Sequence, residues 1–152
     1  MTEMRSLKSL ITATFALLTL VFLVPAVPAH AQFPAYLHAI SDLRSARAYL
    51  QQDTRPQFEG HRHRAIDEIS RAIDDMKKAA VDDGKNLGST PPPQSGGNPG
   101  APIHTALRLL EEARRDVASG ADSPENRGLQ VRSLQHIDKA QEELHHILDS
   151  SM

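Results

Sequence analysis

The segment KNLGSTPPPQSGGNPGAP, residues 85–102, divides the chain into two parts. Proline removes helix hydrogen bonds, glycine adds backbone freedom, and the segment has few apolar side chains to bury. We therefore expect a linker here, partly stiff and partly flexible, between residues 32–84 and residues 103–152.

Each of these parts contains two segments with helical periodicity. Residues recur at alternating steps of three and four, a pattern typical of the contact stripe in a helical bundle. Before the linker the two stripes are Phe33, Tyr36, Ile40, Leu43, Arg47, Leu50 and Arg62, Ile66, Ile69, Ile73, Met76, Ala80. After it they are Ile103, Leu107, Leu110, Arg114, Val117 and Gln130, Leu134, Ile137, Gln141, Leu144, Leu148. Each part is predicted to be a helical hairpin.

Residues that favour helix ends agree with these segments. Gly84 and Gly120 lie where the second and third helices should stop. Ser123-Pro124-Glu125 has the order of an N-cap, a first helical proline and an acid in the first turn, so it predicts the start of the fourth helix.

The two hairpins have similar sequences. A shift of 67 positions places Ala39, Leu43, Ala46 and Arg47 on Ala106, Leu110, Ala113 and Arg114. A shift of 68 places Arg64, Ile69, Ala72 and Asp75 on Arg132, Ile137, Ala140 and Glu143. Duplication of one hairpin explains this similarity, and shared helical periodicity explains part of it without duplication.

One amphipathic hairpin leaves its apolar stripe exposed, so we predict an all-α fold in which both hairpins pack as one antiparallel four-helix bundle. If the helices alternate in direction along the chain, the first and third begin at one end and the second and fourth at the other. The order of the helices around the bundle is left open.

The first 31 residues have the features of a secretory signal peptide. Arg5 and Lys8 precede an uncharged apolar run over residues 10–24, which is shorter than the ~20 residues of a spanning helix. Ala29 and Ala31 form a small-x-small cleavage pattern. We therefore predict cleavage after Ala31, a periplasmic or secreted protein, and no membrane span in the mature chain.

The order of LHAISDLRSAR, AIDEISRAIDDMKKAAVDDGK, a proline-rich gap, IHTALRLLEEARRDV and RGLQVRSLQHIDKA resembles a group of short exported bacterial proteins known only as hypothetical proteins. The resemblance covers essentially all of residues 32–152. It implies export and two helical hairpins, and it implies no activity, cofactor or site residue.

Composition excludes several classes of function. The net charge of −2 and the 4% of aromatic residues argue against nucleic-acid binding, and the absence of cysteine excludes disulfides and thiolate chemistry. No nucleophile–base set and no phosphate-binding glycine loop is visible in the sequence. We expect a protein without catalytic activity and without a cofactor.

Two arginines on the contact stripes suggest an anion site. With alternating helix directions, Arg47 and Arg114 fall at the same end of the bundle, with Arg64 and Arg132 on the helices that begin nearby. Guanidinium groups and helix N-termini bind phosphate, sulfate or carboxylate. The alternative is structural, because carboxylates of the same chain can neutralise these arginines.

Histidines suggest a second alternative, a periplasmic site for zinc, copper or nickel. His38, His104 and His145 with Asp83 are the candidate ligands, and they fall near one end if helix directions alternate. Against this site, a helical wheel places His38 roughly opposite the centre of the apolar face, and no two histidines have the i,i+4 spacing of ligands on one helix face.

The prediction for function is therefore an exported, non-enzymatic helical bundle that serves as a binding or structural module of the cell envelope. Its partner, a protein or another envelope component, is not specified by the sequence, and an oligomer is possible.

Overall fold

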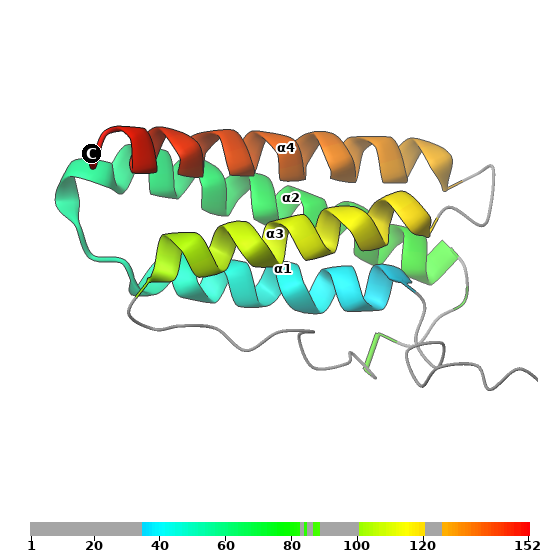
Figure 1. Ribbon diagram of the computed structural model, residues 1–152. Helices are drawn as coiled ribbons and strands as arrows, with labels where there is room; N and C mark the ends of the chain where they lie inside the picture. Colours follow the sequence, from blue (N-terminus) through cyan, green and yellow to red (C-terminus); the bar gives the residue numbers. More distant parts are fainter. Residues whose placement is uncertain (1–34, 83, 85–86, 89–100, 121–125) are drawn as a thin grey trace, which may run out of the picture.

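The computed structural model describes residues 35–82, 84, 87–88, 101–120 and 126–152. These residues form four α-helices and one short 3-10 turn, and no strand occurs among them. The helices are α1 (Ala35–Gln52), α2 (Glu59–Asp82), α3 (Pro102–Ser119) and α4 (Arg127–Asp149), and the turn η2 (Pro56–Phe58) precedes α2. The predicted all-helical bundle is confirmed for this part of the chain (Figure 1).

Each helix packs on two neighbours: α1 and α4 both contact α2 and α3. The end of α3 meets the start of α1, because a Cβ atom built on Gly120 would lie 3.3 Å from the Cβ of Ala35. The start of α4 meets the end of α2, where Asn126 Nδ2 donates to the Ala79 carbonyl. All neighbouring helices are consequently antiparallel, and α2 runs in the same direction as α3 (Figure 1).

The expectation of alternating helix directions is wrong. At one end, which we call the Tyr36 end, α1 and α4 begin; at the other, the Phe58 end, α2 and α3 begin (Figure 1). The end of α2 and the start of α3 therefore lie at opposite ends of the bundle. The 24 residues of α2 are ~36 Å long, and residues 83–101, when extended, reach ~60 Å. The connection is long enough to permit this direction.

Small residues form much of the core. Leu43, Ile69, Leu110 and Ile137 from the predicted stripes are fully buried. Seven alanines that the stripes omit are buried equally well: Ala39, Ala46, Ala65, Ala72, Ala106, Ala113 and Ala140. Because alanine allows two helices to approach closely, the buried face of each helix is broader than a strict three-four stripe.

The ends of α2 and α3 are completed by nearby groups. Gly84 has a φ of 66° and donates its backbone N–H to the Val81 carbonyl, which ends α2 as the sequence predicts. α3 ends before Gly120, and Gln130 Nε2 donates to the Val117 carbonyl at 2.7 Å, which occupies one of the free acceptors at that end. The predicted cap at residues 123–125 lies outside the described residues.

Within the part of the chain that the structure describes, no helix is long and apolar enough to cross a membrane.

Candidate functional site

Polar side-chain pairs join the hairpins across the contact between α2 and α4, and three of them are arranged symmetrically. Arg64 Nε donates to Glu143 Oε1 at 2.8 Å, and Arg132 Nε donates to Asp75 Oδ2 at 3.4 Å. Between them, His136 Nδ1 lies 2.5 Å from Glu68 Oε2. We call these three contacts the interhairpin polar pairs.

The interhairpin polar pairs have two-fold symmetry. On α2 the order is Arg64, Glu68, Asp75, and on α4 it is Arg132, His136, Glu143, with identical spacings of four and seven residues. Because the helices are antiparallel, the arginine of each helix meets the acid at the far end of the other. The middle residues, Glu68 and His136, meet each other on the axis.

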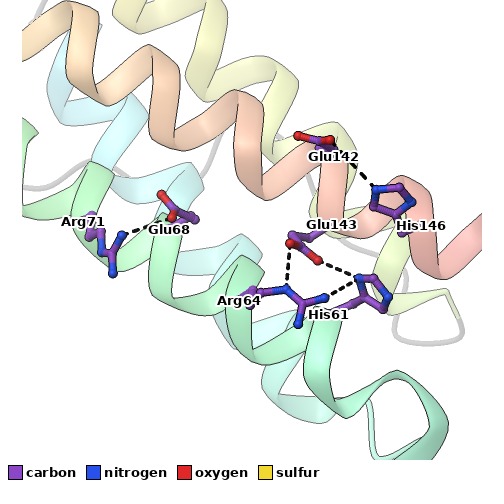
Figure 2. A network of polar contacts seen from close by, with 7 residues as sticks. All are labelled: His61, Arg64, Glu68, Arg71, Glu142, Glu143 and His146. Atoms are coloured by element: carbon purple, nitrogen blue, oxygen red, sulfur yellow. Dashed lines mark hydrogen bonds and ion pairs between the residues drawn. The ribbon is translucent and has the colours of Figure 1, made fainter.

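The pair nearest the Phe58 end belongs to a larger network (Figure 2). Glu143 accepts from Arg64, and it also accepts from His61 Nδ1 at 2.6 Å. A carboxylate cannot donate a hydrogen bond, so His61 Nδ1 carries a proton and donates it to Glu143. A protonated Nδ1 cannot at the same time accept a hydrogen bond from the nearby Arg64 Nη2. The hydrogen bond from Arg64 lowers the pKa of Glu143 below its ordinary value, burial opposes this shift, and the hydrogen bond from His61 adds to it.

A second histidine continues this network toward the end of α4. The His146 ring lies 5.4 Å from the His61 ring, centre to centre, and its Nε2 is 3.9 Å from Glu142 Oε1 (Figure 2). Both His146 and Glu142 are more than half exposed. This part of the network is accessible to solvent and adds little to stability.

A groove of about 440 Å³ follows the α2–α4 contact. We call it the α2–α4 groove; its lining residues are Arg64, Asp67, Glu68, Arg71, Lys139, Glu142 and Glu143. All of these side chains are ionisable, three of them basic and four acidic. Asp67 and Lys139 are exposed. Such a surface can recognise a partner that also carries charges of both signs.

The structure separates the four arginines of the predicted anion site. Because α3 runs opposite to the expected direction, Arg47 lies toward the Phe58 end and Arg114 toward the Tyr36 end. Arg47 Nη1 donates to Ser70 Oγ at 3.3 Å, and Arg114 Nε donates to Asp138 Oδ1 at 2.7 Å. Asp138 raises the pKa of Arg114 through this hydrogen bond.

These two contacts are also related by the internal symmetry. Arg47 corresponds to Arg114 under the shift of 67, and Ser70 corresponds to Asp138 under the shift of 68. Each stripe arginine therefore joins the two helices of its own hairpin. Arg64 and Arg132 join the two hairpins, and each has its carboxylate partner in the same chain.

The candidate metal ligands do not gather at one end. His38 lies near the start of α1 at the Tyr36 end, whereas His104 and His145 lie at the Phe58 end, in the first turn of α3 and near the end of α4. Asp83 is outside the described residues. His38 is half-buried, although the helical wheel places it opposite the apolar face, because α1 is buried on most of its circumference over residues 36–43.

No group of three or more histidine and acidic side chains within the described segments has a geometry suited to a metal ion.

Two features of this site were not anticipated from the sequence. His136 and Glu68 are the central interhairpin pair, and the shift of 68 that aligns Arg64 with Arg132 also aligns these two residues. Asp42 is fully buried, although its counterpart under the shift of 67 is Leu109. The sequence does contain a signal for the burial of Asp42, because the corresponding position in the second hairpin is the apolar Leu109.

Comparison of the chain with protein-family models, with curated proteins and with solved structures finds no match.

Proposed function

We propose that this chain is an exported, non-enzymatic helical module that binds a protein of the cell envelope through the α2–α4 groove. The observation that carries the proposal is the lining of the groove, which consists of charged side chains of both signs from two helices. Charged groups arranged in this way provide specificity and association rate more than affinity.

The available charges in the groove support this role. Arg64 and Glu143 are bonded to each other, and Arg71 is bonded to Glu68. Asp67 and Lys139 are exposed at the groove, so their charges can be offered to a partner. We expect a partner segment with an acid that meets Lys139 and a base that meets Asp67.

The proposal is tested by site-specific crosslinking in the native envelope fraction. A photoreactive amino acid replaces Lys139 in the groove, and in a control variant it replaces Arg115, which is exposed on α3. We expect one discrete crosslinked protein at position 139 that is absent at position 115. The substitution Asp67→Lys should reduce its yield several-fold. The same crosslinked products at both positions would contradict the proposal.

Export is part of the proposal, and it rests on the signal-peptide features of residues 1–31. The mature protein is expected in the periplasm or the medium with Gln32 as its first residue. Amino-terminal sequencing of the protein from cell fractions checks this, and the change Ala31→Arg should block cleavage. An intact amino terminus in the cytoplasm would refute export.

A further inference from the structure

The polar residues that α2 presents to α4 are complementary to a second copy of themselves. Arg64 and Asp75 are 11 residues apart on α2, and Arg132 and Glu143 are 11 residues apart on α4. In an antiparallel pair of two α2 helices, each Arg64 would meet the Asp75 of the other copy. In the same way, an antiparallel pair of two α4 helices would match Arg132 with Glu143 in both directions.

The two outer pairs, Arg64–Glu143 and Arg132–Asp75, therefore do not determine whether α2 packs on α4 of its own chain or on α2 of a second copy. The buried residues Ile69 and Ala72 of α2 do not decide it either, since their counterparts on α4 are Ile137 and Ala140, whereas the buried Ala65 corresponds to Ser133. The central position differs. Two α2 helices would place Glu68 against Glu68, and two α4 helices would place His136 against His136.

Arg71 of α2 donates to Glu68 in any pairing, and only the pairing of α2 with α4 adds a donor from the facing helix. In that arrangement His136 Nδ1 lies 2.5 Å from Glu68 Oε2, and both side chains are less than one-fifth exposed. Two Glu68 carboxylates at the same place would repel each other, and each would keep only Arg71 of its own helix as a partner. Two His136 rings would lose Glu68 as their acceptor.

We propose that the face of α2 that meets α4 also fits the same face of a second copy of this chain, and that the Glu68–His136 pair directs each hairpin to the other hairpin of its own chain. The partner that the pair excludes is therefore a second molecule of the same protein. A polar pair at one central position sets partner choice in other helical assemblies.

The test exchanges the central residues in the full mature chain. In Glu68→His every possible pairing has two histidines at the centre, and in His136→Glu every pairing has two glutamates. Either single change therefore removes the preference of α2 for α4 that the Glu68–His136 pair provides. The double variant Glu68→His/His136→Glu restores a glutamate opposite a histidine and should restore the preference.

Pairing with a second copy is measured by crosslinking. The chain contains no cysteine, so Asp67→Cys introduces one thiol beside the centre of α2. The proteins are refolded at about 1 mM, comparable to the effective concentration that a flexible linker provides, and treated with a short bismaleimide. A control thiol at Val81, near the end of α2, would lie ~35 Å from its copy in antiparallel pairing and should not crosslink.

We expect several-fold more crosslinked dimer through position 67 in each single variant than in the parent chain, and a return to the parent level in the double variant. If the single variants lose stability but their dimer yield stays at the parent level, the pair only stabilises the bundle and the proposal is overturned. Failure of the double variant to restore the parent level overturns it as well. Both results are obtained with the purified chain alone, so they do not depend on whether the α2–α4 groove binds an envelope protein.

Discussion

The hydroxyl group of Ser133 is buried in the bundle and has no hydrogen-bond partner among the residues that the structure describes. Its counterpart in the first hairpin is Ala65, which is fully buried. A buried hydroxyl without a partner costs free energy, so Ser133→Ala should raise the free energy of unfolding by about 1 kcal/mol. The matched reverse change, Ala65→Ser, should lower it by about 1–2 kcal/mol. Urea denaturation measures both, and destabilisation by Ser133→Ala would show that the hydroxyl has a partner.

Glu143 links stability to pH. Its pKa in the folded protein is below the ordinary value of 4.5, because it accepts hydrogen bonds from Arg64 and His61. As the pH falls, the Glu143 carboxylate therefore takes up a proton at a higher pH in the unfolded chain than in the folded protein. The stabilisation is present above pH ~5 and is lost as the pH falls through the folded pKa.

The substitution Glu143→Gln removes this contribution. We expect the variant to be less stable than the parent at pH 7 and the difference to shrink as the pH is lowered toward 3. Urea denaturation at a series of pH values measures it. A difference that does not change with pH would mean that the carboxylate charge makes no contribution.

The close contact between α1 and α3 at the Tyr36 end depends on one glycine. A Cβ atom at Gly120 would lie 3.3 Å from the Cβ of Ala35 and 3.2 Å from the Asp116 carbonyl oxygen. We expect Gly120→Ala to lower the free energy of unfolding by about 1 kcal/mol, because the start of α1 must shift.

Gly128 on α4 is the matched control for this change. A Cβ atom there would meet no atom of the described segments within 4 Å, so Gly128→Ala should raise the free energy of unfolding by up to about 1 kcal/mol through helix propensity. Thermal denaturation of both variants measures the contrast. An equal effect of the two changes would show that α1 and α3 do not approach closely at Gly120.

The helices themselves were predictable from local periodicity. Each predicted stripe lies within a described helix, apart from Phe33, which lies outside the described residues. The stripes missed the alanines because residues such as Ala46 and Ala113 show their role only when two helices are in contact. The sequence indicates that Arg47 and Arg114 correspond, but Ser70 and Asp138, which they contact, lie on neighbouring helices and leave no local signal.

The direction of α3 depends on the length of the preceding connection. Deleting residues 89–100 would leave a connection that reaches only ~23 Å, less than the ~36 Å length of α2. We expect the shortened chain to be less stable or to exchange hairpins between two molecules. A Gly/Ser segment of the same length in place of residues 89–100 should behave like the parent.

Size-exclusion chromatography with light scattering and circular dichroism distinguish these outcomes. A shortened chain that remains a monomer of parent stability would indicate that α3 can begin at the other end of the bundle.

The number of helices, their approximate extents and their division into two hairpins follow from the sequence, because helix formation and amphipathic stripes depend on residues three or four positions apart. Which helices run in parallel, and which charged side chains meet, was decided only in the tertiary structure. The long linker permits either direction for α3, and reversing this direction moves Arg114 to the opposite end from Arg47. The contact of Glu68 with His136 likewise exists only because α2 and α4 pack side by side in opposite directions.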